Sequence, residues 1–597
     1  MISQELKQTI KGSEFLIKDT EAKDVFIPEE YTEEQKMIYE MCEDFLEQEV
    51  WPVTERLDNM EEGLMPAVMD KAAELGLLGL SIPMEFGGME MGFISSQLVA
   101  EATGAGNSFA VAISAHCGIG TLPILYYGNE AQKAKYLPKI ASGEWKACYC
   151  LTEPNSGSDA NSGKTQAVLS EDSTYYTLNG QKMWITNAGF ADVFTVFAKI
   201  GDDNTLSAFI VDNSMEGIEL NTEEKKMGIK GSSTRQVFFN NVKVPAENLL
   251  GKREEGFKIA LNILNIGRVK LGASAVGACK KVITRGVQYS GEREQFGNPI
   301  HRYGAIKGKI AEQVIKTYAS ESATYRVCQD IEDRINLLIE QGKEKESAYL
   351  EGIEQFASEC AIMKVHGSEV LDYVVDEGVQ IYGGMGYSAE APMERAYRDA
   401  RINRIYEGTN EINRMVIVDI ILKRAMKGEI DFMTAAMNVA KELMTIPNMN
   451  GSSTDLFSAE KAYVKNYKKA VLMVLGAAAK QLGKSLKAEQ EILMNVADMV
   501  IEAYVSESVL LRVEKLVGIR GEEACSTQIA IMRTYIYNAA DKINKAAKDA
   551  LNSFAEGDEQ RVMLMGVKRY TKHEPFNVKD ARRSIADYII NEGRYCI

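Results

Sequence analysis

The sequence has few of the residues that build metal centres. Its 597 residues include only four histidines and nine cysteines, and both types are scattered without the spacing of metal ligands. We therefore predict no metal-binding residues. An odd number of scattered cysteines does not suggest a disulfide framework either, and this indicates a reduced cytoplasm.

Positive charge and long apolar runs are also scarce. The net charge is −17, which argues against binding to nucleic acid. The longest apolar runs, such as VLMVLGAAA at 471–479, are too short to span a bilayer. The opening MISQELKQTIKG has neither an apolar signal core nor an Arg-rich transit pattern. These absences predict a cytoplasmic protein.

The chain is too long for one hydrophobic core, so several domains are expected. Changes of pattern divide it into an N-terminal strap (1–34), an α-helical domain (35–148), a β domain (149–256), a second α-helical domain (257–430) and a helical extension (431–597). The predicted fold class is therefore α+β and multidomain.

Periodicity supports this division. From Thr32, TEEQKMIYEMCEDFLEQEVWPV begins with a capping pattern and carries apolar residues close to a 3.6-residue period. Between 149 and 256 the period shifts to two, in runs such as KMWIT and DVFTVFAKI. The sequence thus predicts an antiparallel β-barrel or sandwich between helical domains, a C-terminal four-helix bundle, and a further helical bundle in the extension.

The stretch RINRIYEGTNEINRM (401–415) is the strongest candidate for chemistry. Its carboxylate, Glu407, lies in a Gly-containing break between two helical patterns. Such a loop can fix one carboxylate beside free backbone N–H groups, as a general base beside a polarised oxygen requires. From spacing alone, however, a solvated turn is the stronger interpretation, because Glu407 is one of 85 acidic residues.

A second candidate is the loop YCLTEPNSGSDAN (149–161), which opens the β domain. Its small and hydroxyl residues, including Thr152, Gly157 and Ser158, would let backbone N–H groups approach an anion closely. Ordinary turns have the same composition, so this loop alone is a weak signal.

Taken together, these stretches resemble the acyl-CoA dehydrogenase flavoprotein family. YEGTNEI after GGMGY, the YCLTEPNSGSD loop, KMWITNAG and REQFG all match in order and type, over about residues 32–430. The resemblance implies FAD as cofactor and a fatty acyl-CoA as substrate. It makes Glu407 the base that removes the α-proton during α,β-dehydrogenation.

The resemblance also implies two groups of cofactor-binding residues. Those at the flavin and its phosphates are Tyr149, Leu151, Thr152, Gly157, Ser158, Trp184, Thr186, Thr409 and Asn410. Those expected to reach the FAD held mainly by a neighbouring subunit are Arg293, Gln295, Phe296, Gln380, Gly383 and Gly384. The family often has Gln near Lys307, so the lysine puts one peripheral cofactor contact in doubt.

Substrate contacts are implied at Ser158, Asn265, Arg268 and Gly408. Some subfamilies, resembling isovaleryl-CoA dehydrogenase, carry a base immediately before the arginine, where this chain has Gly267. Glu407 is then the only base that matches the family. The form NILNxGR is most similar to the very-long-chain enzymes, and a glycine here would leave room for an acyl chain.

The extension of about 170 residues again resembles the very-long-chain enzymes, which are dimers. The resemblance therefore implies a homodimer that acts on long-chain substrates in fatty acid β-oxidation and passes electrons to electron-transferring flavoprotein. The extension is slightly basic on an acidic body, which would suit peripheral membrane contact, although a solvated surface is the stronger interpretation.

Two other functions remain open. An acyl-CoA oxidase would use O₂ directly, and a flavoprotein scaffold would have no catalytic role. Glu407 and the acidic body argue against the scaffold.

Overall fold

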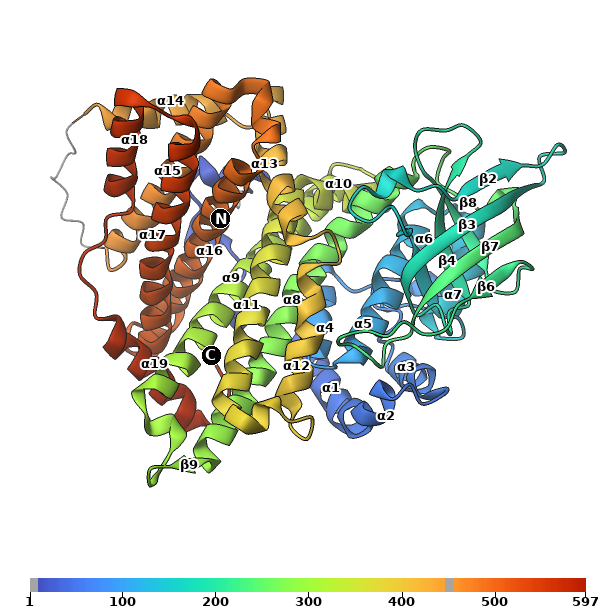
Figure 1. Cartoon of the computed structure of the whole chain (residues 1–597), viewed down its shortest axis with the longest axis horizontal. Coiled ribbons are helices and arrows are strands. Elements are labelled where there is room, and N and C mark those ends of the chain that lie inside the picture. The colour runs from blue at the N-terminus through green and yellow to red at the C-terminus, as the bar shows by residue number, and fades with distance from the viewer. Residues whose placement is uncertain (1–8, 446–454) are drawn as a thin grey trace, which may run out of the picture.

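The computed structural model describes residues 9–445 and 455–597. A central layer of long helices separates a β domain on one side from the C-terminal extension on the other (Figure 1). This arrangement confirms the predicted fold class of helical, β, helical and additional helical parts.

The first helical domain begins as the sequence predicts. Thr32 caps α1 by accepting a hydrogen bond from the Gln35 N–H, while the Gln35 side chain accepts from the Thr32 N–H. The helices of this domain are α1 (Glu33–Phe45), α2 (Thr54–Asp58), α3 (Leu64–Glu74), α4 (Phe93–Thr103), α5 (Ser108–Ser114), α6 (Leu122–Tyr127) and α7 (Glu130–Ala141). A π-helical turn, η7 (Ala115–Gly120), joins α5 to α6.

The β domain is a single eight-stranded sheet. Its strands are β1 (Ala147–Cys150), β2 (Gln166–Leu169), β3 (Tyr175–Thr186), β4 (Val193–Ile200), β5 (Ser207–Asp212), β6 (Ile218–Leu220), β7 (Thr234–Pro245) and β8 (Leu249–Leu250). The order is β6-β7-β3-β2-β4-β5-β8, with β1 beside β4. Most pairs are antiparallel, as predicted, but β1 and β2 run parallel to β4.

The central helices are α8 (Gly256–Glu292), α9 (Gly304–Glu340), α10 (Lys345–Gln355), α11 (Ala357–Tyr382), α12 (Pro392–Ala400) and α13 (Asn410–Lys427). At the far end of α8, β9 (Glu294–Gln295) and β10 (Asn298–Pro299) form a short hairpin. Segments 108–127 and 256–292 are long and apolar enough to cross a membrane, yet most of each is buried inside this fold. They are core helices here.

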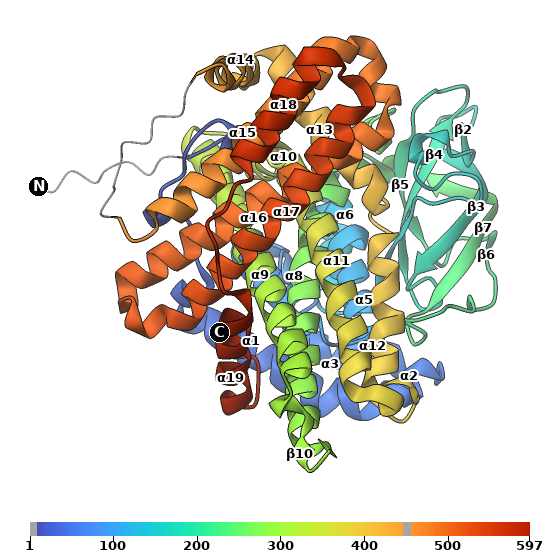
Figure 2. The same cartoon turned by 60° about the vertical axis from the view of Figure 1, so that its left-hand side comes forward.

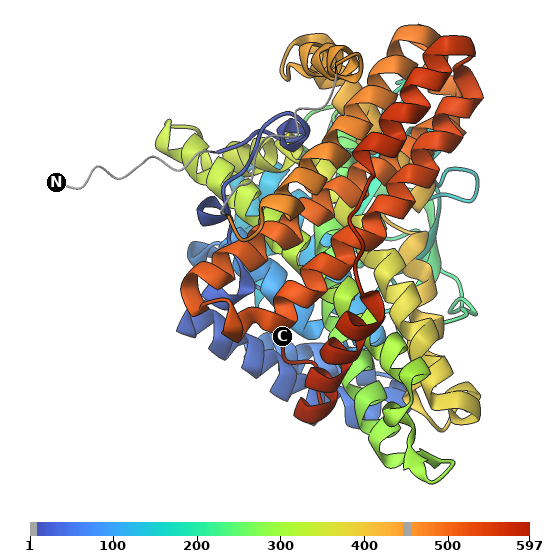
Figure 3. The same cartoon turned by 90° about the vertical axis from the view of Figure 1, so that its left-hand side faces the viewer.

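The extension is a helical bundle, as predicted. It contains α14 (Phe432–Leu443), α15 (Ser458–Leu482), α16 (Gln490–Arg520), α17 (Ser526–Phe554), α18 (Gly557–Tyr570) and α19 (Val578–Glu592). Figures 2 and 3 show α16 and α17 crossing over α9, and α19 also packs on α9. Most of the expected linker 446–457 lies outside the described residues.

The described part of the N-terminal strap lies against this extension. Phe15 and Leu16 are fully buried, and the Phe15 ring centre is 4.8 Å from that of Tyr504 on α16. The strap therefore packs on the part of the chain most distant from it in sequence.

A buried ion cluster joins the strap, the central helices and the extension. Arg512 of α16 donates to Glu321 of α9 over 2.7 Å and to Glu29 of the strap over 3.0 Å. Its guanidinium also lies over the Tyr318 ring, 3.9 Å from the centre. Because Arg512 is only 2% exposed, its loss would remove this cation from the largely enclosed carboxylates of Glu29 and Glu321.

We expect Arg512→Met to weaken the docking of the extension by about 3–5 kcal/mol, since removing one partner leaves uncompensated buried charge. Limited proteolysis and the melting temperature will measure this loss. Lys545→Met is the control, because its pair with Asp549 is exposed and should change stability by less than about 1 kcal/mol. Equal melting temperatures for the two variants would contradict the assignment.

Candidate active site

Glu407 lies in the loop between η12 (Arg401–Arg404) and α13. Its φ is +59°, and that of Gly408 is +80°, so two successive residues are left-handed. This conformation is costly for a residue with a Cβ and is typical of functional sites, where the surroundings enforce it. The loop is therefore a constrained feature and not the solvated turn that spacing alone favours.

Three helices hold this loop by its carbonyl groups. Arg268 of α8 donates to the Glu407 carbonyl oxygen over 3.3 Å. Lys364 of α11 and Asn413 of α13 each donate to the Gly408 carbonyl oxygen over 2.7 Å. These contacts fix the backbone while the Glu407 carboxylate stays free.

The environment makes Glu407 a base suited to neutral pH. Its Oε2 is enclosed and has no hydrogen-bond partner among the described residues. Burial raises the pKa of Glu407 to about 7, and the nearby charges of Arg268 and Lys364 oppose this rise in part. A Cβ on Gly267 would lie only 2.8 Å from Oε2, so the glycine makes room for the carboxylate.

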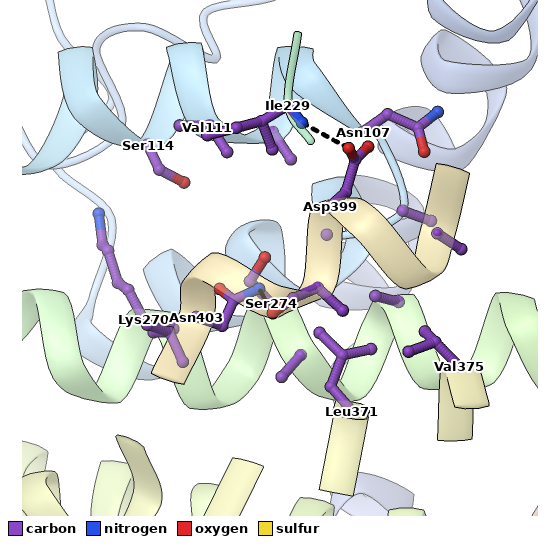
Figure 4. Close-up of a pocket in the computed structure, with 18 of the residues that line it drawn as sticks. Asn107, Val111, Ser114, Ile229, Lys270, Ser274, Leu371, Val375, Asp399 and Asn403 are labelled. Carbon is purple, nitrogen blue, oxygen red and sulfur yellow. Dashed lines mark hydrogen bonds between the residues drawn. The ribbon is translucent and has the colours of Figure 1, made fainter. Parts of the chain in front are cut away.

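The carboxylate lines a cavity of about 180 Å³ between α5, η7, α8 and α12. Its walls are mostly apolar or small, at residues that include Val111, Ala115, Leu271, Ala275 and Ala396. Figure 4 shows how side chains from these elements face the same space.

Asp399 of α12 closes one wall of the cavity. It accepts a hydrogen bond of 2.5 Å from the Ile229 N–H, drawn dashed in Figure 4, and so ties α12 to the β domain. Burial raises its pKa to about 7. Two carboxyl groups of the cavity therefore titrate near neutral pH.

The expected flavin residues meet at the β-domain side of the same region. Thr186 lines the cavity together with Glu407. Burial and then Glu407 raise the pKa of Tyr149, which places the two side chains near each other. Leu151 is buried next to Tyr149, and Thr152 follows at the end of β1.

These residues fit an isoalloxazine ring. The Tyr149 hydroxyl is buried without a hydrogen-bond partner in the described part of the chain. Trp184 lies within a bulge of β3, between Lys182 and Ile185, has a φ of +62° and is 53% exposed. A strained, exposed tryptophan and a tyrosine hydroxyl without a partner in the described part of the chain are features that suit a planar, polar-edged ligand.

The loop after β1 is held in place by Glu153. This carboxylate accepts from the Lys164 N–H over 2.6 Å, the Thr165 N–H over 3.0 Å and Lys182 Nζ over 2.7 Å. Gly157 and Ser158 lie exposed at the tip, where phosphate contact is expected. The cofactor loop is thus preformed.

The second expected cofactor group lies elsewhere. Its members are exposed just after α8, in the last turn of α11 and in η11 (Gly383–Tyr387): Arg293, Gln295, Phe296, Gln380, Gly383 and Gly384. The Tyr289 and Tyr382 rings stack 3.9 Å apart and bring the two segments together. Arg293 follows Gly267 by 26 residues, about 39 Å of helix, so a single chain does not bring both groups to one flavin.

Some expected contact residues support the site from within the chain. Thr409 caps α13 by accepting from the Ile412 N–H, and the Asn410 side chain is bonded to Lys364 and Glu369. Asn265 accepts from Arg268 over 2.8 Å. Their polar side-chain atoms are therefore engaged in holding the loop.

Lys307, where a glutamine is frequent in the family, forms an ion pair with Asp587 of α19. The departure from the family pattern thus attaches the end of the extension to the central helices.

Sequence reasoning missed Lys364, Asn413 and Asp399. The signal for Lys364 was present, because it is the only charge within the run CAIMKVHG (360–367) of a buried helix. A lone lysine in such a run must find acceptors or line a cavity. Asn413 and Asp399 gave no comparable signal.

Known families and proteins match this chain throughout. The N-terminal, middle and C-terminal domains described for acyl-CoA dehydrogenases match residues 32–144, 148–242 and 254–422. A further family, also described as an acyl-CoA dehydrogenase C-terminal domain, matches residues 466–569.

A probable acyl-CoA dehydrogenase of Bacillus subtilis (strain 168) is 44% identical over 588 residues, 98% of each chain. The human mitochondrial very long-chain specific enzyme is 43% identical over 58% of this chain and 51% of its own. An acyl-CoA dehydrogenase of Bacillus anthracis, solved with FAD, is 45% identical over 98% of this chain and 100% of its own, with a TM-score of 0.96. The chain therefore belongs to the acyl-CoA dehydrogenase family of FAD-dependent oxidoreductases.

Proposed function

We propose that this acyl-CoA dehydrogenase oxidises long-chain fatty acyl-CoA to trans-2-enoyl-CoA in fatty acid β-oxidation, in the cytoplasm, and passes electrons to electron-transferring flavoprotein. The observation that carries the proposal is Glu407, an unpartnered base at the end of a cavity that continues along α8.

Glu407 is suited to remove the α-proton of the thioester. Its Oε2 faces no competing donor among the described residues, and a pKa of about 7 makes it a stronger base than an exposed carboxylate. When bound, FAD supplies the two-electron acceptor for the β-hydride. The Glu407 N–H has no acceptor in the described part of the chain, so it can polarise the thioester oxygen.

The length of the cavity supports a long acyl chain. Its lining runs along α8 from Gly267 beside the base to Arg285. Gly267 and Arg285 are 18 positions apart, which corresponds to about 27 Å of helix. Ser274, Ala275 and Ala278, which line the path, are small and leave the way open for an extended chain.

Exposed aromatic residues support a homodimer. Phe296 is 93% exposed and Tyr387 is 88% exposed, and both lie in the segments that carry the second group of cofactor residues. An exposed apolar patch of this kind marks an interaction surface. In a dimer this surface would meet the cofactor of the other subunit.

We also propose peripheral membrane contact through the extension. Met433 and Met437 of α14 are 45% and 53% exposed, and Met444 after the helix is 78% exposed. This apolar stripe at the outer edge of the extension would suit a lipid surface.

Removing the base tests the reaction. We expect Glu407→Gln to slow anaerobic bleaching of the flavin by long-chain acyl-CoA by about 10²–10⁴-fold, the usual cost of losing a positioned base. Chains of four to eighteen carbons, compared in wild type, will show the length preference. Rapid bleaching in the variant would mean that another residue is the base. Turnover of wild type in air without an added acceptor would instead favour the oxidase.

The acidity of Glu407 predicts the pH profile. Because its pKa is raised to about 7, the carboxylate is protonated and inactive below that pH. We expect kcat/KM for flavin reduction to fall tenfold per pH unit below about 7 and to level off above about 8. Asp399→Asn is the control, because Asp399 also titrates near 7 but is not the base. Loss of the pH dependence in that variant would contradict the assignment to Glu407.

Introducing one charged side chain tests the proposed dimer surface. We expect Phe296→Asp to convert a dimer into monomers, measured by light scattering, and to increase the loss of FAD on dilution. Met84→Asp is the matched control, since Met84 is 71% exposed in the first helical domain. A monomeric wild type that retains FAD would rule out this surface.

A further inference from the structure

Lys270 is a buried lysine directed into the substrate cavity. It lies on α8, one turn beyond Gly267, and is 8% exposed. Figure 4 shows its side chain extending from α8 across the cavity toward Ser114 of α5. The amine thus faces the space that the acyl group is proposed to fill.

Lys270 differs from every other buried lysine in the described ranges. Each of the others has an acceptor within the chain: Lys133 with Glu346, Lys146 with Asp70, Lys182 with Glu153, Lys364 with Gly408 and Asn410, and Lys468 with Glu507. Lys270 donates no hydrogen bond and forms no ion pair within residues 9–445 and 455–597.

No nearby group of the chain can neutralise this amine. Burial lowers the pKa of Lys270, and the Cys117 thiol is the one side chain whose charge would oppose this shift. Burial raises the pKa of the Cys117 thiol to about 12, so it carries no charge at neutral pH. The two carboxyl groups of the cavity interact with other cations. The charges of Arg268 and Lys364 act on Glu407. Those of Arg398 and Arg395 act on Asp399.

An amine that faces a mostly apolar cavity without a partner among the described residues is costly, and an apolar residue would line a cavity for a plain acyl chain at lower cost. The amine becomes favourable when a ligand brings an acceptor to it. A site built to bind a substrate oxygen also rejects analogues that lack it, because the buried donor is then left unpaired.

We propose that Lys270 selects acyl groups that carry an oxygen acceptor, a carboxylate or a hydroxyl, on the acyl chain. The inference rests on the proposed function, because it assigns the same cavity to the acyl group. Lys270 lies 3 residues from Gly267 and 15 from Arg285, so the oxygen would bind nearer to the reacting carbons than to the far end. A short dicarboxylic acyl group would end at the amine, whereas a longer hydroxylated chain would pass it.

Matched substrates test the proposal. For chain lengths of five to eight carbons, bleaching of the flavin is compared for the plain acyl-CoA, its ω-hydroxy derivative and its ω-carboxy derivative. We expect wild type to favour one oxygenated series at some length by about tenfold to a hundredfold, the range of a hydrogen bond to a charged group. Whichever derivative is favoured identifies the acceptor.

Lys270→Met keeps the length of the side chain and removes the amine. We expect this variant to lose the preference, while Lys270→Arg keeps part of it. Lys545→Met, the same substitution at an exposed lysine of α17, should keep all of it. Calorimetric binding of the same ligands to the Glu407→Gln enzyme, which does not consume them, should show the same ratios of Kd.

Three results would overturn the inference. The first is a wild type that favours plain chains at every length. The second is an oxygenated preference that survives in Lys270→Met. The third is a Lys270→Met variant with an altered flavin spectrum but an unchanged substrate ratio, which would make the cofactor the partner of the amine. If no acyl-CoA of any kind bleaches wild type, the proposed function itself fails.

Discussion

The hydrogen bonds to the carbonyl groups of Glu407 and Gly408 are the constraint on which the site depends. Arg268, Lys364 and Asn413 come from three helices, and together they hold a left-handed backbone that the loop would not keep alone. Arg268 and Lys364 also limit the rise that burial causes in the pKa of the carboxylate. Position and pKa of the base thus have a common origin in the packing of α8, α11 and α13.

Helix α8 connects the reacting end of the cavity to the surface where a second subunit is expected. Gly267 makes room for the base, Lys270 and Leu271 line the cavity beyond it, and Arg293 ends the helix among exposed cofactor residues. A single long, mostly buried helix can carry all of these because it is rigid and packs against α11 over much of its length. The residue proposed to select the substrate and the surface proposed for assembly therefore lie along one element.

The extension is attached by charge as well as by apolar packing. Arg512 reaches the strap and α9, and Lys307 reaches α19. Lys307 departs from the family pattern, and the role of this lysine is visible only in the folded structure. In the sequence it puts one peripheral cofactor contact in doubt, and in the structure it supplies an ion pair to a part of the chain 280 residues away.

The sequence by itself determined the order of helical and β parts, because residue periods of 3.6 and 2 are local properties, and it singled out Glu407 and Trp184 through the motifs that contain them. Tertiary structure alone decided that Asn410 and Asn265 support the loop and that β1 and β2 run parallel to β4. It also decided that Lys364 is paired, while Lys270 has no partner among the described residues. The physical reason is that a buried polar group acquires its role from the partners around it. Those partners come from helices and strands far apart in the chain, whose contacts no local pattern records.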